Sequence, residues 1–493
     1  MPGTHRNAAS TTTPARWEYA PAPESIEVAI APQQHLFING VFSPAHSDRF
    51  FPSINPATEE KLCDVAEADG QDVELAVKAA TDALRRWKRA NPRERSRHLF
   101  RLARRIAERS RELAALETTD GGKPIREARD IDLPLVAQHF FYHAGWADKL
   151  RYALPGVIDP QPVGVCGQII PWNFPLLMCA WKLAPALACG NTCVLKPAET
   201  TSLTALRLAE ILQEIDFPKG IVNIITGAGE TGRMMVDHPG IHKIAFTGST
   251  AVGREIARAL AGRNVRLTLE LGGKSPNIIF DDAAIDQAIE GIVQGIFFNQ
   301  GHVCCAGSRL LVQESIRDEV VEKLENRMQL LRVGDPMDKN TDVGAINSKS
   351  QLETIQRYIQ IGVREGATLC SINECSLPER GYWHRPCFLT NVQPSHTVAR
   401  EEIFGPVLAV MTFRTPQEAV ERANNTPYGL SAGVWTNSGS RMFEIAKQLR
   451  AGVVWCNTFN QFDPASPFGG YRESGFGREG GIHGLAAYLK EGG

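Results

Sequence analysis

The stretch VGVCGQII, residues 163–170, is the first of several short apolar runs that are typical of buried strands. Further runs of this kind occupy residues 192–195, 222–225, 243–246 and 277–280. Helical stretches separate them, among them residues 202–214 and 253–261. Because strand–helix alternation covers both faces of a sheet, the pattern predicts an α/β fold with a parallel, doubly wound sheet. A second alternating set, residues 284–455, follows.

Two helices are predicted upstream of this stretch, over residues 73–87 and 93–117. The second is rich in arginine, but glutamates interleave with the arginines, which is typical of a solvated helix face rather than of a nucleic-acid surface. Residues 1–35 are predicted to be a flexible N-terminal extension. A transit peptide is the alternative there, although four prolines among the first 23 residues oppose an amphipathic helix.

The composition is typical of a soluble globular protein of about three structural units. The 493 residues are 43% hydrophobic and 22% charged, with a formal net charge of −2. This balance argues against nucleic-acid or membrane partners, and no apolar run approaches the roughly 20 residues of a membrane helix. Eleven cysteines, an odd number without any C-x-x-C pair, predict reduced thiols in a cytoplasmic protein and no structural metal.

Two glycine-containing turns are candidate phosphate-binding sites. GAGETG, residues 227–232, fits the dinucleotide pattern G-x-G-x-x-G, but a chain with 43 glycines matches it easily by chance. FTGSTAVG, residues 246–253, follows a predicted strand and opens a helix, so that its backbone N–H groups and the helix dipole favour a phosphate. A plain serine or threonine N-cap is the alternative for this second turn.

Six further segments accompany these turns. They are PWNFP (171–175), LKPAE (195–199), LELGGK (269–274), FFNQGHVCCAG (297–307), EEIFGP (401–406) and SPFGG (466–470). In this order and spacing they resemble the NAD(P)-dependent aldehyde dehydrogenase superfamily, over almost everything from residue 35 to residue 488. The resemblance implies two doubly wound parallel-sheet domains and a small, here shortened, oligomerisation arm. The implied boundaries are 36–137 with 161–272 for NAD binding, 273–480 for catalysis, and 138–160 with 481–493 for oligomerisation.

The resemblance implies NAD-dependent oxidation of an aldehyde to the carboxylic acid, through a thiohemiacetal and a thioester on Cys304. The side-chain amide of Asn173 and the backbone N–H of Cys304 would stabilise the oxyanion. Glu270, between two leucines that would raise its pKa, would activate water. Lys182 and Glu479 match family positions for thiol activation or proton relay.

The implied cofactor is NAD rather than NADP, because a carboxylate at Glu199 would repel a 2′-phosphate. The matching cofactor positions are Trp172, Lys196, Glu199, Gly229, Gly248, Ser249, Glu402 and Phe404. The matching substrate-tunnel positions are Phe174, Leu177, Met178, Trp181, Phe298, Val303, Cys305, Asn460, Phe462 and Phe468. This lining favours apolar aliphatic or aromatic aldehydes, while a quaternary ammonium aldehyde is an alternative through cation–π contact.

Three features depart from the family pattern. His302 replaces a residue that is usually Gln or Glu, and it either tunes the thiol or fills space. The segment 150–161 is shorter than the usual oligomerisation hairpin, and the chain ends five residues after Tyr488, where relatives usually continue into a strand. We therefore expect a homodimer, with the usual tetramer in doubt.

Rival functions are a CoA-acylating relative and an inactive relative that serves as a binding protein. Glu270 counts against the first, since a CoA acceptor does not need a base for water. The retained motif residues count against the second. A structural reading of Glu270 would require an ion-pair partner, for which nearby Lys274 is a candidate.

Overall fold

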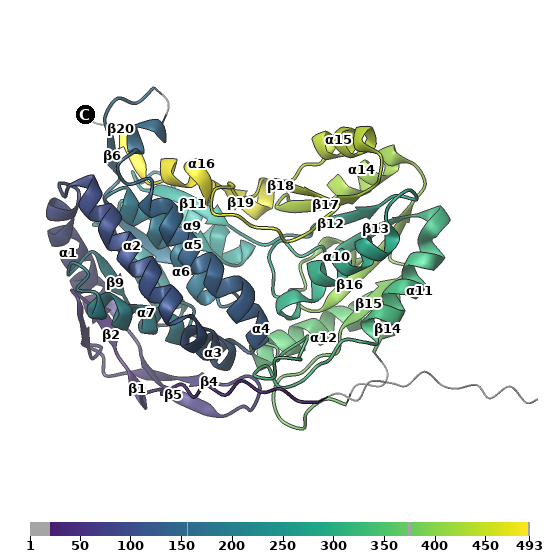
Figure 1. The fold of residues 1–493 in the computed structure, drawn as a ribbon, viewed down its shortest axis with the longest axis horizontal. Coiled ribbons are helices and arrows are strands. Elements are labelled where there is room, and N and C mark those ends of the chain that lie inside the picture. The colour runs from purple at the N-terminus through teal and green to yellow at the C-terminus, as the bar shows by residue number, and fades with distance from the viewer. Residues whose placement is uncertain (1–19, 155, 373–375, 492–493) are drawn as a thin grey trace, which may run out of the picture.

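Two α/β halves lie side by side, each around its own sheet (Figure 1). The structure is a computed structural model that describes residues 20–154, 156–372 and 376–491. The chain builds the first half as far as residue 270, builds the second half from residue 276, and returns to the first sheet through β19 (Gly475–Phe476). Within the described residues, no helix combines the length and apolarity needed to cross a membrane.

The first sheet has eight strands in the order β19-β11-β10-β7-β8-β9-β2-β3. The five strands from β11 to β9 are parallel, and antiparallel strands flank them. All residues of β7, β8, β9 and β10 are buried, as in a parallel sheet covered on both faces. The remaining bounds are β2 (Leu36–Ile38), β3 (Val41–Ser43), β7 (Val165–Ile169), β8 (Thr192–Lys196), β9 (Val222–Ile224), β10 (Lys243–Thr247) and β11 (Arg266–Glu270).

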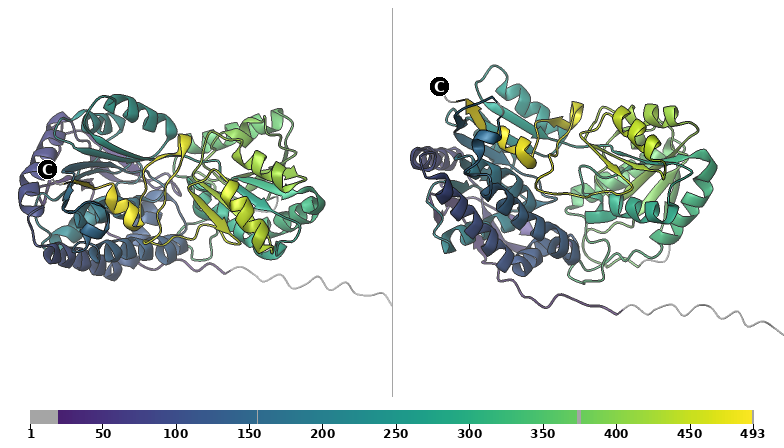
Figure 2. Two further views of the ribbon diagram at one scale, coloured as in Figure 1. Left: turned by 90° about the horizontal axis from the view of Figure 1, so that it is seen from above. Right: turned by 45° about the horizontal axis from the view of Figure 1, so that its top comes forward.

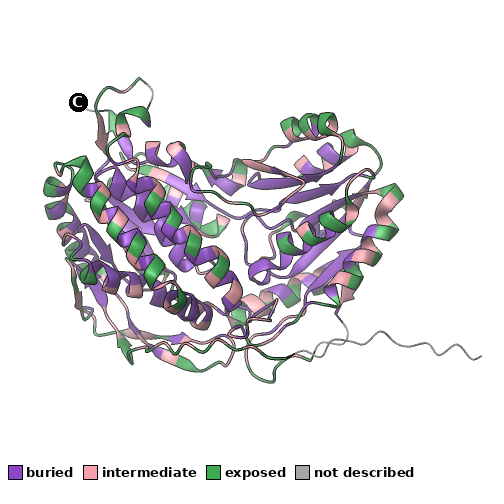
Figure 3. Ribbon diagram, in the orientation of Figure 1, coloured by how far each residue is buried: buried purple, intermediate pink, exposed green. Residues whose placement is uncertain are grey.

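Helices cover both faces of this sheet, so the predicted doubly wound arrangement is confirmed. One face carries α1 (Gly70–Trp87), α8 (Gly229–Asp237) and α9 (Thr250–Leu260). The other carries α2 (Pro92–Glu108), α3 (Ser110–Gly121), α5 (Leu133–Ala144), α6 (Pro175–Ala188) and α7 (Leu203–Glu214). Figure 3 shows the buried strands behind helices whose outer sides are exposed.

The second sheet has seven strands in the order β14-β15-β16-β13-β12-β17-β18, all parallel except β14. Their bounds are β12 (Pro276–Ile279), β13 (Arg309–Gln313), β14 (Thr368–Ser371), β15 (Cys387–Thr390), β16 (Val407–Phe413), β17 (Ser431–Trp435) and β18 (Val453–Cys456). One face carries α10 (Ile285–Phe297) and α11 (Arg317–Met328). The other carries α12 (Lys349–Arg364), α13 (Thr397–Arg400), α14 (Pro416–Asn424) and α15 (Gly439–Gln448).

The run at 277–280 belongs to this second sheet as β12, not to the first series with which the pattern grouped it. The chain crosses between the halves at Gly272 and Gly273. A Cβ at Gly273 would lie 2.5 Å from the backbone oxygen of Cys304, so the crossing passes too close to the other half for a larger residue.

The single helix predicted over residues 93–117 is wrong, because the chain forms α2 and α3 there. Arg109, at φ −97° and ψ 13°, ends the first helix. The break lets α2 pack on α5 and α6 while α3 packs on α7. Arg109 also pairs with Glu112, three residues further on, at 2.8 Å and with distant Glu214 at 2.5 Å, and the second pairing has no signature in helical spacing.

A strand does follow Tyr488, which corrects the expectation that it is lost. β20 (Leu489–Glu491) pairs antiparallel with β6 (Pro160–Pro162), and the Val163 N–H donates to the Tyr488 carbonyl oxygen at 3.2 Å. Figure 1 shows this two-stranded sheet projecting from the first half. The remaining helical segments are α4 (Ile125–Glu127), α16 (Gly481–Ala486), a π-helical turn at Ala128–Asp132, and 3₁₀ turns at Leu150–Tyr152, Phe298–Gly301, Glu314–Ile316 and Arg472–Ser474.

Residues 20–35, the described part of the predicted extension, run along the surface of both halves (Figure 2). The carboxylate of Glu24 accepts a hydrogen bond from Arg111 of α3. The backbone N–H of Glu24 donates to the backbone oxygen of Met337 at 2.8 Å. A small sheet then forms in the order β1 (Gln33–Gln34), β5 (Lys61–Ala66) and β4 (Phe50–Ile54). These contacts hold the segment against the molecule. Residues 1–19 of the predicted extension lie outside the described residues.

Candidate active site

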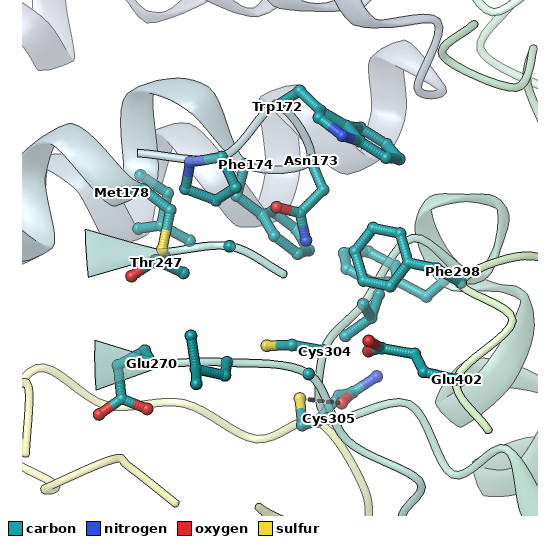
Figure 4. A pocket seen from close by; sticks show the side chains of 18 of the residues that line it. Trp172, Asn173, Phe174, Met178, Thr247, Glu270, Phe298, Cys304, Cys305 and Glu402 are labelled. Atoms are coloured by element: carbon teal, nitrogen blue, oxygen red, sulfur yellow. Dashed lines mark hydrogen bonds between the residues drawn. The ribbon is translucent and has the colours of Figure 1, made fainter. Parts of the chain in front are cut away.

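A cavity of about 330 Å³ lies between the two halves, where β7, β10 and β11 end (Figure 4). Of the predicted catalytic residues, it is lined by Asn173, Glu270, Cys304 and Glu479. Of the predicted cofactor residues, it is lined by Trp172, Gly248, Ser249, Glu402 and Phe404. All of the predicted tunnel residues line it as well. The structure places the remaining predicted residues outside the cavity wall: Lys182, Lys196, Glu199 and Gly229.

Cys304 lies in the loop after the 3₁₀ turn Phe298–Gly301, and it is half-buried. A hydrogen bond with the thiol of Cys305, together with burial, raises the pKa of the Cys304 thiol well above its ordinary value. The Cys305 thiol also donates to Oδ1 of Asn460 at 3.6 Å. Within the described residues, the backbone N–H of Cys304 donates to no protein acceptor. The thiol is therefore protonated at rest, and it must lose its proton before it can attack a carbonyl.

The side-chain amide of Asn173 faces the same space as Cys304 (Figure 4). Its Nδ2 donates one hydrogen to the backbone oxygen of His302 at 2.7 Å, which leaves its second N–H for another acceptor. Asn299 fixes this arrangement, because its own Nδ2 donates to the Asn173 carbonyl oxygen at 2.7 Å. Asn299 has a φ of 48°, in the left-handed region that asparagine tolerates better than most residues.

A buried cluster of charged and titratable residues, Lys123, Glu127 and Asp132, contacts this loop. Oε2 of Glu127 accepts from the Asn299 N–H at 2.9 Å, and burial raises the pKa of Glu127 to about 8. Lys123 Nζ lies 2.5 Å from Oδ2 of Asp132 and 4.3 Å from the centroid of the Phe174 ring. The cluster therefore contacts both the Asn299 loop and the aromatic tunnel wall.

Glu270 ends β11 with a buried carboxyl group. Burial, followed by the charge of Glu479, raises the pKa of Glu270 well above its ordinary value. Among the described residues, neither carboxyl oxygen of Glu270 nor Nζ of Lys274 has a hydrogen-bond partner, so the ion pair between them is not formed. In the view of Figure 4 the carboxyl group is turned away from Cys304, and it must rotate to act there.

Lys182 of α6 and Glu479 form a buried ion pair through Nζ and Oε1. Glu479 lines the cavity, whereas Lys182 lies behind it. The charge of Lys182 lowers the pKa of Glu270, and that of Glu479 raises it. The ionisation of Glu270 is therefore linked electrostatically to this pair.

The predicted cofactor residues follow the carboxyl ends of neighbouring strands, which is where doubly wound sheets bind ligands. Gly248 and Ser249 connect β10 to α9. The Ser249 hydroxyl accepts an N–H from the first turn of α9 at 3.3 Å, so the N-cap alternative is present at this turn. Lys196 ends β8, Nζ of Lys196 lies 3.9 Å from Oε2 of Glu199, and Gly229 begins α8.

Glu402 reaches this edge from the second half and packs against the crossing glycines. Its Oε1 accepts from the Gly273 N–H at 3.1 Å, and a Cβ at Gly272 would lie 2.0 Å from Oε2. Burial raises the pKa of Glu402 to about 7. Gln351 holds the following loop by donating to the Phe404 carbonyl oxygen at 2.9 Å.

Aromatic rings form much of the tunnel wall. Phe174 and Phe298 stack with centroids 6.1 Å apart. Trp181, Phe462 and Phe468 form a second group, with centroids 5.4 to 6.0 Å apart. The wall therefore favours apolar surface on a bound molecule.

Several residues that line the cavity were not predicted from the sequence. They are Ile131, Asp132, Leu135, Thr247, Leu271, Gly272, Gln294, Gln351, Thr354, Tyr358 and Ile403, with Pro171. Thr247, Leu271 and Gly272 lie within recognised motifs, so adjacency could have suggested them. Ile131 and Leu135 share helical spacing, but spacing alone does not show which cavity a helix face meets.

The comparison with known proteins now decides the family. Residues 42–491 match the model of the aldehyde dehydrogenase family. The chain belongs to that family. This aldehyde dehydrogenase is 47% identical over 467 residues to the mitochondrial aldehyde dehydrogenase of Homo sapiens, with 92% of this chain and 90% of that protein covered. It is 46% identical over 472 residues to retinal dehydrogenase 2 of Homo sapiens, with the same coverage.

A solved structure supports the same assignment. The NAD+ complex structure of aldehyde dehydrogenase from Bacillus cereus matches with a TM-score of 0.91 at 42% identity, covering 94% of this chain and 98% of that chain. The predicted family, enzyme class and fold of this aldehyde dehydrogenase are confirmed.

Proposed function

We propose that this NAD-dependent aldehyde dehydrogenase makes the free carboxylic acid, with Cys304 as the nucleophile. The observation that carries the proposal is the meeting of a thiol, an amide donor and a carboxyl group of raised pKa in one cavity. The carboxyl group of Glu270 favours water as the acyl acceptor over CoA, since water is the acceptor that needs a base.

In the first step the Cys304 thiol releases its proton to solvent water, the resulting thiolate adds to the carbonyl carbon of the aldehyde, and the carbonyl oxygen becomes an oxyanion. The second N–H of Asn173 and the backbone N–H of Cys304 are the donors for this oxyanion. Loss of two electrons and the aldehyde hydrogen then converts the adduct to a thioester on Cys304. NAD, when bound, supplies the acceptor for them.

In the second step water attacks the thioester. Glu270, once rotated toward Cys304, takes a proton from the water, and the acid leaves as the thiolate is restored. The carboxylate of Glu479, which pairs with Lys182 and interacts electrostatically with Glu270, is the next acceptor for that proton.

The residues at the carboxyl edge of the first sheet fit NAD. Gly248 and Ser249 present the N-terminus of α9 to a phosphate. Glu402 offers a carboxylate to the nicotinamide ribose, with Trp172 and Phe404 beside it. Lys196 and Glu199 would offer hydrogen bonds to the adenosine ribose, and Gly229 would lie near the adenine.

Replacing Asn173 by alanine should lower kcat by about 10²- to 10³-fold, because one of two oxyanion donors is lost. The measurement is steady-state NADH formation with hexanal and benzaldehyde. Asn460→Ala is the matched control: it removes a cavity amide that lies at the tunnel, so it should change KM for the aldehyde more than kcat. Equal kcat losses in the two variants would refute the oxyanion assignment.

Replacing Glu199 by serine should raise kcat/KM with NADP by about 10-fold, because the carboxylate that repels the 2′-phosphate is gone while Lys196 remains. Activity with NAD should fall as a ribose hydrogen bond is lost. The control is Glu444→Ser, an exposed glutamate of α15 in the other half. An unchanged NADP-to-NAD ratio in Glu199→Ser would contradict the assignment.

We infer that the substrate is an apolar aliphatic or aromatic aldehyde, because aromatic rings dominate the tunnel wall. A quaternary ammonium aldehyde is the alternative, which the same rings would accept. Comparing kcat/KM for hexanal and benzaldehyde with that for betaine aldehyde separates the two.

We propose the cytoplasm as the compartment of this enzyme, since every described cysteine is free. Detection of a fluorescent fusion of the protein outside the cytoplasm would contradict this.

We propose residues 36–137 with 161–272 as the NAD-binding domain, 273–480 as the catalytic domain, and 138–160 with 481–493 as the oligomerisation segments. The division of strands between the two large sheets supports the first two, except that β19 (Gly475–Phe476), within 273–480, pairs with β11 of the first sheet. We also propose a homodimer, because β6 and β20 together form only a two-stranded arm. A clean tetramer in light scattering at micromolar concentration would overturn this.

A further inference from the structure

His302 lies at the centre of an aromatic group that borders the cofactor end of the cavity. Its ring meets Trp172 edge-on, with centroids 4.8 Å apart, and stacks on Phe404 at 5.9 Å and 21°. Trp172 and Phe404 also meet directly, at 5.2 Å and 89°. Both of these neighbours line the cavity, whereas His302 stands behind them.

The imidazole of His302 makes little use of its polar atoms. The side chain is buried, and Nε2 has no hydrogen-bond partner among the described residues. Burial, together with the charge of Lys123, lowers the pKa of His302 to about 3, so the ring is neutral at physiological pH. A buried imidazole that neither charges nor hydrogen-bonds through Nε2 contributes mainly its flat aromatic surface.

The backbone of His302 is tied to the oxyanion donors. Its carbonyl oxygen accepts from Nδ2 of Asn173 at 2.7 Å and from Nδ2 of Asn299 at 3.4 Å. Two residues later comes Cys304. The ring therefore sits where the cofactor wall and the reacting loop join.

We propose that His302 is a positioning residue that braces Trp172 and Phe404 as the aromatic wall against which the nicotinamide half of the cofactor binds. It acts as a flat spacer and not as an acid, a base or a regulator of the thiol. The inference rests on the proposed cofactor site at Glu402 and Phe404.

The experiment compares His302→Phe, His302→Gln and His302→Ala by steady-state kinetics with NAD and benzaldehyde. Removing the ring in His302→Ala deletes two aromatic contacts and should raise KM for NAD by about 10-fold, while KM for benzaldehyde changes less than about 2-fold. His302→Phe restores the flat surface and should bring KM for NAD back to within about 2-fold of the wild type. His302→Gln keeps hydrogen-bonding atoms without a ring, so it should resemble His302→Ala.

The opposite ranking of KM for NAD among the His302 variants would overturn the proposal. If His302→Gln keeps the wild-type KM for NAD while His302→Phe loses it, the side chain acts through hydrogen bonds. If His302→Ala leaves KM for NAD unchanged, the His302 ring does not position Trp172 and Phe404 for cofactor binding. Should His302→Ala fail to fold, His302→Leu fills the space without an aromatic face, and it should still show the raised KM for NAD.

Phe404→Ala separates failure of this inference from failure of the cofactor site. A raised KM for NAD in Phe404→Ala but not in His302→Ala refutes only the role of His302. Unchanged KM for NAD in both variants refutes the cofactor site itself, and with it the inference.

Discussion

Replacing Cys304 by alanine should lower kcat/KM for NADH formation by about 10⁴-fold or more, because the proposed nucleophile that forms the covalent adduct is removed. The loss should be the same for hexanal and benzaldehyde, since the nucleophile serves every substrate. The measurement is NADH absorbance at saturating NAD. Thermal unfolding of the variant should stay close to that of the wild type, because Cys304 is only half-buried at the cavity wall.

Cys305→Ala is the matched control for this loss. Cys305 is the adjacent thiol, and it donates to Oδ1 of Asn460 in the tunnel. Its replacement should change KM for the aldehyde while turnover continues. A loss of turnover in Cys305→Ala as large as that in Cys304→Ala, or measurable turnover without Cys304, would contradict the assignment.

Replacing Glu270 by glutamine should leave a burst of about one NADH per active site and then slow turnover by about 10²- to 10⁴-fold. Addition of the thiolate and loss of hydrogen do not require the Glu270 base, whereas hydrolysis of the thioester does. Stopped-flow absorbance resolves the two phases. A linear trace at the wild-type rate, or a loss of the burst together with turnover, would refute the role of Glu270 in deacylation.

Glu270→Gln also tests how kcat depends on pH. The pKa of Glu270 is raised by burial and by Glu479, so the carboxylate that acts as base becomes more abundant as pH rises through that raised pKa. Wild-type kcat should therefore increase with pH over this range, and the slow turnover of Glu270→Gln should lack that increase. Identical pH profiles for the two proteins would assign the titration to another group.

Much of the first sheet is predictable because four of its five parallel strands, β7 to β10, are short, fully buried runs. The run 192–195 becomes β8 (Thr192–Lys196), and 243–246 becomes β10 (Lys243–Thr247). The assignment of 277–280 to a sheet was not predictable in this way, since a buried run does not state which neighbours it pairs with. The break at Arg109 was missed because it depends on packing and on an ion pair with distant Glu214, not on a glycine or proline.

In the candidate site, too, residues within local motifs were predictable and residues that act through long-range contacts were not. Cys304, Glu270 and Asn173 lie in local motifs, and the structure brings all three to one cavity. Their supports were missed, because they arise from contacts between distant segments. The carboxyl group of Glu127, for example, accepts the Asn299 N–H across 172 residues of chain. Hydrogen bonds of this range leave no periodic or motif signal in the sequence.

The most direct test of the thioester mechanism is mass spectrometry of Glu270→Gln quenched just after the burst with NAD and benzaldehyde. The mechanism predicts one acyl group per chain, placed on Cys304 by peptide fragmentation and absent when NAD is omitted. An acyl group on Cys305, or unmodified Cys304 in protein that has completed its burst, would contradict it.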